Sequence, residues 1–136
     1  MDSCIFCKIA GGEIPSATIY EDENVRVILD IAPAAKGHAI LLPKYHAANI
    51  FELPEETAAK IFAVVPKVAR AIRDELGCDG MNIVQNNGEA AGQTVFHLHI
   101  HFLPRWKNDT VQVAWKQGSY AEGEAAELAK QIAERL

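Results

Sequence analysis

The sequence predicts an α+β fold in one domain, with a mainly antiparallel sheet of about five strands, one long central helix and a C-terminal helix. Short apolar segments rich in β-branched residues follow one another along the chain, separated by polar turns. Two other segments repeat apolar residues every three or four positions, as amphipathic helices do. The chain has 136 residues, which is enough for one ordinary core and too few for two.

The strand-forming segments are bounded by turn signals. The first two flank the polar turn 21–24 and predict a hairpin. The loop 30–37 carries proline and glycine, and the strand after it is expected to end at Pro43. In chain order, we expect strands at 17–20, 25–29, 38–42, 81–85 and 96–103, with a further short strand at 111–115 as a candidate.

The long helix is expected to begin at Pro54, because proline suits a first turn and the two acids that follow it favour the positive end of the helix dipole. Gly77 fits the position that ends such a helix, and Pro66 inside the run predicts a kink. A second helix is expected at 122–136. The apolar stripe of the long helix consists of Ile61, Val65, Val68, Ile72 and Leu76.

The composition restricts the function. Lys and Arg number 13 against 18 Asp and Glu, whereas proteins that track nucleic-acid phosphates usually present a basic face, so no nucleic-acid partner is expected. A small anion could still bind a local pocket of donors. No apolar run approaches the roughly 18–20 residues of a membrane span, so no membrane partner is expected. Residues 1–12 do not resemble a signal peptide, and we expect a cytoplasmic protein with reduced thiols.

Three of the five histidines stand at alternate positions, His97, His99 and His101. The residues between them are apolar, so a strand here would place the imidazoles on one face and core residues on the other. Alternate Cα atoms on a strand lie roughly 6.5–7 Å apart, so neighbouring histidines could share a metal but all three could not easily do so. The row therefore predicts that the three histidines have different roles and do not form one shared metal site. The alternative is a solvent-exposed polar face on which histidine happens to recur.

A polar loop precedes this row. Asn86, Gly92 and the pair Gln93-Thr94 supply amides, a hydroxyl and main-chain N–H groups that could cradle phosphate oxygens. Taken alone, the loop is better explained as a polar turn between two strands. Its position directly before the histidines favours phosphate binding.

The segment from Gly92 to Arg105, GQTVFHLHIHFLPR, resembles the signature of the histidine triad (HIT) family of nucleotide hydrolases and transferases. Flanking pieces that resemble the family appear in its order from Ile5-Phe6 onward, and the N-terminal cysteines resemble its zinc-bearing, phosphoramidase-like bacterial branch. The resemblance implies a HIT-like fold. It also implies a single HIT domain over 1–136, with its core within 4–105 and a divergent C-terminal segment at 106–136.

The resemblance implies catalysis by three histidines. His99 would attack the α-phosphate of a purine nucleotide conjugate, and water would release AMP or GMP from the nucleotidyl-histidine intermediate. Its other ring nitrogen is expected to be held by a main-chain carbonyl. His101 and His38 would flank the phosphate, where a protonated neighbour could stabilise charge and protonate the leaving group. The alternative for His38 is a histidine that merely begins a strand.

The resemblance also implies a nucleotide-binding site. Asp30 would accept hydrogen bonds from the ribose hydroxyls, and Asn86 would bond near the scissile bond. Gln93 and Thr94 would contact the phosphate or the leaving group. An apolar slot would hold the base, although its residues could equally belong to an ordinary core. The slot positions are Phe6, Ile14, Ile28 and Ile31.

Cys4 and Cys7 form a C-x-x-C pair without the βαβ setting of a thioredoxin-type redox site. A closed tetrahedral zinc site needs two more ligands. The resemblance implies that these are His46 and His97, and that the zinc is structural. The alternative is two reduced thiols packed as small apolar groups, without metal. Cys78 is expected to be a passive buried thiol.

These expectations favour a nucleoside phosphoramidase without an organic cofactor. A dinucleoside polyphosphate hydrolase is the alternative among enzymes. A catalytically vestigial nucleotide-binding scaffold and a zinc-stabilised interaction module are the alternatives from other classes. A homodimer is expected because family members are usually dimers, and because Val64 and Ala71 widen the apolar face of the long helix beyond what one core needs.

Overall fold

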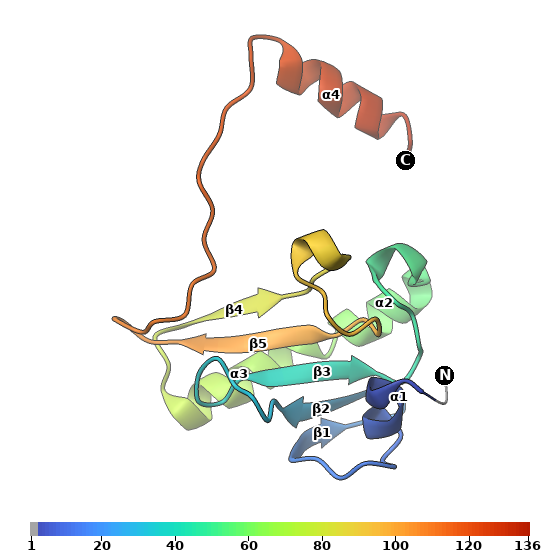
Figure 1. Cartoon of the computed structure of the whole chain (residues 1–136), viewed down its shortest axis with the longest axis vertical. Helices are drawn as coiled ribbons and strands as arrows, with labels where there is room; N and C mark the ends of the chain where they lie inside the picture. The colour runs from blue at the N-terminus through green and yellow to red at the C-terminus, as the bar shows by residue number, and fades with distance from the viewer. Residues whose placement is uncertain (1–2) are drawn as a thin grey trace.

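The computed structural model describes residues 3–136 and contains one five-stranded sheet, whose strand order is β1-β2-β3-β5-β4 (Figure 1). Every neighbouring pair is antiparallel, which confirms the predicted α+β class. The strands are β1 Thr18–Glu21, β2 Val25–Leu29, β3 Ala39–Pro43, β4 Gly80–Val84 and β5 Ile100–Arg105. The helices are α1 Ile5–Ala10, α2 Glu55–Phe62, α3 Val65–Leu76 and α4 Glu124–Ala133, with short 3-10 helices at Ile50–Glu52 and Glu89–Ala91.

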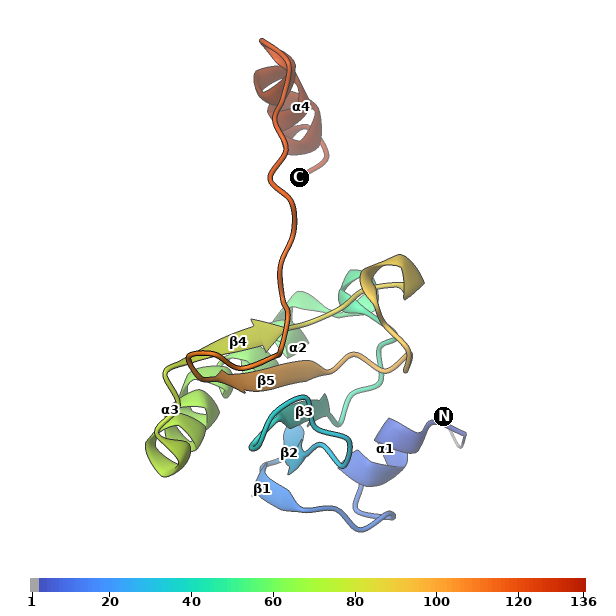
Figure 2. The same ribbon diagram turned by 60° about the vertical axis from the view of Figure 1, so that its left-hand side comes forward.

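The two faces of the sheet carry different partners. On one face Val27, Leu41 and Ile100 lie side by side and pack with the buried side chains of α3. On the other face Ile28, Ile40 and His101 lie side by side, beside α1. Figure 2 shows α1 on one side of the sheet and α3 on the other. The face beside α1 therefore carries the end of the histidine row.

The expected long helix is two helices. α2 ends at Phe62 and α3 starts at Val65, so the kink expected at Pro66 is a full interruption at Ala63 and Val64. The reason is that Pro66 has no N–H to donate to the carbonyl of Phe62, and its ring would clash with that carbonyl in a continuous helix. Gly77 ends α3 with φ +64°, as expected.

Strand β5 is shorter than predicted. Its ladder begins at Ile100, and residues 96–99 form an irregular stretch with a bend at 96–97 ahead of the regular strand. The expected alternation holds within the ladder, where Ile100 and Phe102 pack in the core beside α3 and His101 lies on the other face. His97 and His99 are buried, which excludes a solvent-exposed polar face for them. The candidate strand at 111–115 is wrong, since this stretch has no regular structure. The sequence reasoning also missed α1, a helix too short to show a clear apolar period.

The C-terminal segment leaves the body of the protein. All residues from Gln112 to Leu136 are exposed, and both views show α4 standing apart from the sheet (Figures 1 and 2). α4 lies within the predicted range 122–136, and its apolar side is uncovered, with Leu128 39% and Ile132 55% exposed. Among residues 3–136, no helix is both long and apolar enough to cross a membrane.

Candidate active site and metal centre

The orientation of His99 is fixed by one hydrogen bond. Its Nδ1 lies 2.8 Å from the carbonyl oxygen of His97 in a buried setting. A carbonyl can only accept, so Nδ1 carries the ring proton and donates it. The neutral ring therefore has its free lone pair on Nε2, which is the arrangement that a nucleophilic imidazole requires. The main-chain carbonyl expected to hold this ring is that of His97.

His38 and His101 form a directional chain of hydrogen bonds. The N–H of Ala34 donates to His38 Nδ1 at 3.0 Å, so in neutral His38 the ring proton sits on Nε2. That Nε2 lies 2.9 Å from His101 Nδ1 and donates to it, which places the proton of His101 on its own Nε2. The ring centroids of His101 and His99 are 4.9 Å apart. The three imidazoles thus form a continuous group with a lone pair on His99 and an N–H donor on His101.

Burial keeps the two flanking imidazoles uncharged in the free protein. Desolvation lowers the pKa of His38, with Asp30 opposing that shift. Desolvation, followed by the nearby His99 and His38, lowers the pKa of His101 to about 4. These shifts favour the neutral form of both rings near pH 7 in the free protein, so the expected protonated neighbour would require proton uptake when the phosphate binds. A neutral His101 still offers its Nε2–H as a hydrogen-bond donor.

Asp30 follows β2 and faces this chain. One of its oxygens accepts from the N–H of Ala32 at 2.8 Å, and the other lies 3.6 Å from His38 Nε2. Asp30, His38 and His101 are close enough to share a metal ion. However, a metal would need the lone pair of His38 Nε2, whereas the donation from Ala34 keeps the proton on that nitrogen. The hydrogen bonds therefore favour an acid–base role for this group over metal binding.

A second cluster lies at the start of the histidine row. Cys4, Cys7, His46 and His97 place one ligand atom each within 4.8 Å of one another. The distances from His97 Nδ1 are 3.5 Å to Cys4 Sγ, 3.4 Å to Cys7 Sγ and 3.1 Å to His46 Nδ1. A zinc tetrahedron with two sulfur and two nitrogen ligands has edges of roughly 3.3–3.8 Å. The donor set and its spacing therefore fit zinc.

The ring of His97 is oriented for this cluster. Its Nε2 lies 2.8 Å from the carbonyl oxygen of Pro43 and donates to it, which leaves the lone pair on Nδ1, among the other ligand atoms. Burial lowers the pKa of His97, so the ring is neutral, as a ligand must be. Burial together with the neighbouring Cys4 raises the pKa of the Cys7 thiol in the metal-free arrangement. A bound cation would reverse that preference and favour the thiolate.

The loop before the histidines is braced by Gln93. This side chain is 2% exposed and its Oε1 accepts from the N–H of Gly88 at 2.8 Å. Its Nε2 donates to the carbonyl oxygens of Ala48 at 2.6 Å and Val95 at 3.0 Å. All of its polar groups thus have main-chain partners in the free protein, and these bonds hold the loop in place. Thr94 is exposed and remains available to a ligand.

Two further expected residues meet in this loop. Gly92 has φ +94°, a conformation that favours glycine. A Cβ at Gly92 would lie 3.8 Å from the side-chain nitrogen of Asn86, so these residues are neighbours in the structure. Asn86 is half-buried and Gly92 is exposed, so this edge of the site faces solvent.

The expected base slot is only partly assembled. Phe6 packs beside the cluster that contains Ile28, and its ring meets that of His99 edge-on, with centroids 4.9 Å apart. Ile28 is 5% exposed and belongs to this core. Ile31 is 98% exposed and Ile14 is half-buried. In the free protein Ile31 therefore has no apolar neighbour covering it.

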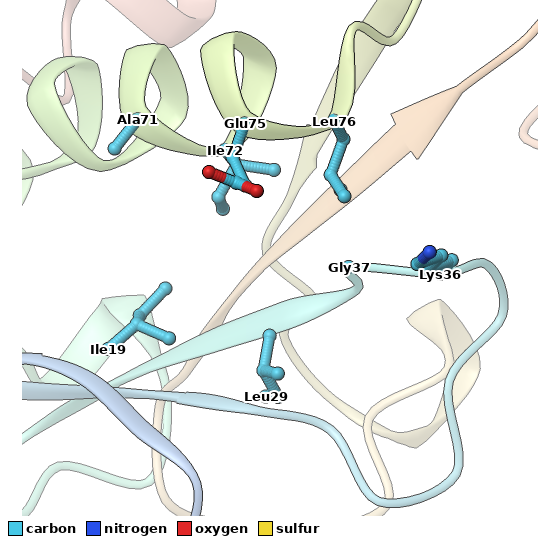
Figure 3. Close-up of a pocket in the computed structure, with 8 residues that line it drawn as sticks. All are labelled: Ile19, Leu29, Lys36, Gly37, Ala71, Ile72, Glu75 and Leu76. Carbon is cyan, nitrogen blue, oxygen red and sulfur yellow. The ribbon is translucent and has the colours of Figure 1, made fainter.

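A cavity of about 450 Å³ lies elsewhere, between α3 and the first strands (Figure 3). Its walls include Leu29, Ile72 and Leu76, and these belong to the side of the sheet that α3 covers. It holds none of the histidines.

The polar groups that matter for the chemistry were partly invisible in the sequence, because the N–H of Ala34 and the carbonyls of Pro43 and His97 belong to the main chain. No sequence signal marks them.

The comparisons with known proteins agree with this geometry. The model of the HIT domain matches residues 11–108. "Protein hit" of Bacillus subtilis is 47% identical, with 99% of this chain and 95% of that protein covered. The adenosine 5'-monophosphoramidase hnt1 of Schizosaccharomyces pombe is 39% identical, with 98% of each covered.

Solved structures are equally similar. The crystal structure of a HIT family member from Bacillus subtilis superposes with a TM-score of 0.94 at 47% identity, covering 98% of this chain and 97% of that one. A zinc-bound histidine triad family protein from Mycobacterium smegmatis gives a TM-score of 0.75 at 41% identity, covering 98% and 96%. With its histidine row, its fold and these relatives, the chain belongs to the HIT domain family.

Proposed function

We propose that the protein is a nucleoside phosphoramidase that cleaves the α-phosphate bond of purine nucleotide conjugates through a nucleotidyl-His99 intermediate. The observation that carries the proposal is the hydrogen bond from His99 Nδ1 to the His97 carbonyl, because it leaves the Nε2 lone pair free to attack phosphorus. The adenosine 5'-monophosphoramidase name of the relative from Schizosaccharomyces pombe supports the substrate class.

The reaction needs two displacements. In the first, the Nε2 lone pair of His99 forms a bond to the α-phosphorus while the bond from phosphorus to the leaving nitrogen breaks. When the anionic substrate binds, the His38–His101 pair takes up one proton from solvent, because a nearby negative charge favours the charged imidazole. The leaving amine takes this proton from the His101 Nε2–H, and the pair returns to its neutral state. In the second, water attacks the phosphorus, His101 Nε2 accepts a proton, and the bond to His99 breaks. The products are a nucleoside monophosphate and an amine.

The remaining expected residues bind the nucleotide in this proposal. Asp30 accepts from the ribose hydroxyls, because one of its oxygens is not engaged by the main chain and lies beside the catalytic chain. Phe6 covers the base next to His99, with Ile14, Ile28 and Ile31 as the apolar surroundings. Gly92, Thr94 and Asn86 line the phosphate side of the site.

Zinc would be held by Cys4, Cys7, His46 and His97, whose four donors fit a closed tetrahedral site. Bound there, zinc would tie α1 to the histidine row, and no ligand position would remain for a reacting water. The zinc-bound relative from Mycobacterium smegmatis supports this assignment. The ligand thiols must stay reduced, and all three cysteines are free, which supports a cytoplasmic location.

A second copy of the chain is the proposed protein partner. Val64 no longer supports it, because this side chain is 6% exposed and belongs to the core beneath α3. Ala71 is exposed, and the uncovered apolar side of α4 offers further surface for a second copy. Removal of residues 122–136 should weaken the dimer, measured as molar mass by light scattering across a concentration series. An unchanged dissociation constant would remove α4 from the interface.

The test of function is AMP release from an adenosine phosphoramidate by the wild type and by His99→Ala. We expect turnover that disappears in the variant while AMP binding, measured by calorimetry, persists. Turnover of diadenosine polyphosphates with no turnover of phosphoramidates would favour the polyphosphate hydrolase. AMP binding without any turnover would favour the catalytically vestigial nucleotide-binding scaffold. Absence of AMP binding would favour the zinc-stabilised interaction module.

A further inference from the structure

We propose that the cluster of Cys4, Cys7, His46 and His97 positions the nucleophile in addition to stabilising the fold, and that Phe6 is a positioning residue that connects α1 to His99. The inference rests on the proposed function, since it concerns the ring that attacks. Two separate links join the cluster to this ring, one through the main chain and one through an aromatic contact.

The first link is the residue His97 itself. Its imidazole is fully buried within the cluster, and its carbonyl oxygen holds His99 Nδ1 at 2.8 Å. The β5 ladder starts only at Ile100, so it does not fix this carbonyl. The main-chain bond at this point runs from the N–H of Leu98 to the carbonyl of Ala47 at 2.8 Å. A metal on the His97 ring would therefore restrain the carbonyl that selects the His99 tautomer.

The second link is the side chain of Phe6, which stands between the two cysteines on α1. Its ring lies edge-on to His99, with centroids 4.9 Å apart and planes at 84°, and also meets His97 at 6.1 Å. α1 has six residues, and a helix of this length is not stable by itself in water. Cys4 caps it by accepting from the N–H of Cys7 at 3.3 Å. Ligation of both cysteines would thus fix the helix that presses Phe6 against the nucleophile.

A purely structural metal site predicts something different. Loss of such a site would lower the melting temperature and the zinc content. In protein that remains folded, however, His99 would keep its tautomer and kcat would not change. Positioning instead predicts that the ring of His99 loses its single orientation in a folded protein. The two ideas therefore separate in measurements on nucleotide-free, folded protein.

The first experiment compares Phe6→Leu with Ile9→Val. Both change a side chain of α1 that packs against the same cluster of buried residues, but Ile9 has no aromatic ring and so cannot make the edge-on contact that Phe6 makes with His99. We expect Phe6→Leu to keep one zinc per chain and to lower kcat about two- to tenfold, the rate equivalent of one edge-on aromatic pair. ¹⁵N NMR of the free protein should show a second His99 tautomer in Phe6→Leu only.

If Phe6→Leu matches Ile9→Val in kcat and in the His99 ¹⁵N shifts, the positioning role of Phe6 is overturned. A rise in KM alone would assign Phe6 to base binding and would equally overturn it. The wild type could lack phosphoramidase activity while Phe6→Leu still shows the second His99 tautomer. That result would contradict the proposed function but support the positioning of His99 by Phe6.

The second experiment removes a ligand with Cys4→Ser and uses Cys78→Ser as the control, since Cys78 lies outside the cluster. Zinc content is measured by mass spectrometry, and the assays are run at a temperature where circular dichroism shows a folded protein. We expect Cys4→Ser to lose zinc, to lower kcat more than it raises KM, and to mix the His99 tautomers. Loss of zinc with kcat and tautomer unchanged would overturn the inference. Should Cys4→Ser not fold, the Phe6→Leu comparison decides it.

Discussion

Replacement of Gly37 by alanine tests how the loop before His38 is held. Gly37 has φ +86°, and a Cβ there would lie 2.1 Å from Leu76 Cδ1 and 3.4 Å from Pro104 Cγ. The left-handed conformation costs a residue with a Cβ roughly 1–2 kcal/mol. Leu76 Cδ1 is the end of a side chain that lines the cavity of Figure 3 and can rotate into it, so relieving the overlap adds about 1 kcal/mol, the low end of the cost of overpacking. Gly37→Ala should therefore lose roughly 2–3 kcal/mol of unfolding free energy, a large share of the ~5–15 kcal/mol typical of a domain.

Gly77 provides the matched control. It has φ +64°, but nothing lies within 4 Å of its added Cβ, so Gly77→Ala should lose only the conformational part, about 1–2 kcal/mol. The assay is urea unfolding at pH 7, followed by circular dichroism. The double variant Gly37→Ala/Leu76→Ala should cost less than the sum of its single changes, because the clashing methyl group is gone. Equal losses for Gly37→Ala and Gly77→Ala, with additive behaviour in the double variant, would refute the steric argument.

Three further predictions concern the site. Asp30→Asn should weaken binding of ribonucleotides more than of 2′-deoxynucleotides, measured by calorimetry; an unchanged preference would remove Asp30 from the ribose site. Chelation of zinc should lower the melting temperature, followed by differential scanning calorimetry with metal analysis, because a metal that binds the folded state stabilises it. The folded pKa of His101 is about 4, below the unfolded value of ~6.5, so the unfolded chain binds more protons and stability should fall as pH drops from ~6.5 to ~4. His101→Gln should flatten this fall in urea unfolding, and an unchanged pH slope would contradict the assignment.

The fold could be predicted where local pattern and tertiary contact agree. The hairpin of β1 and β2 and the buried strand β3 have clear apolar segments and turn signals, and the structure places them as expected. The helix interruption was misjudged because the apolar stripe continues across Ala63 and Val64, although the hydrogen bond lost at Pro66 stops the helix. The C-terminal helix was found by its period, but no local pattern could tell that the body of its own chain leaves it uncovered.

The residues of the metal cluster could be predicted from the sequence, whereas the protonation of the histidine rings could not. Cys4, Cys7 and His46 meet His97 as the resemblance implied, although they are distant along the chain. Which nitrogen of each ring carries the proton depends on main-chain atoms, which every residue type supplies and no sequence pattern marks. Gln93 shows the converse. Its side chain suits a phosphate, but in the free protein all of its polar groups have main-chain partners.

The residue at which β5 begins explains how His97 and His99, only two positions apart, can be a metal ligand and a nucleophile. In a regular ladder, the carbonyl of His97 would be claimed by a neighbouring strand. Because the ladder begins at Ile100, this carbonyl is free to accept from His99, while the ring of the same residue joins the metal cluster. His101 lies inside the ladder, where its pairing with Ile40 fixes its backbone beside β3 and brings its ring to His38. The irregular stretch before the strand is therefore what separates the metal ligand from the nucleophile only two residues away.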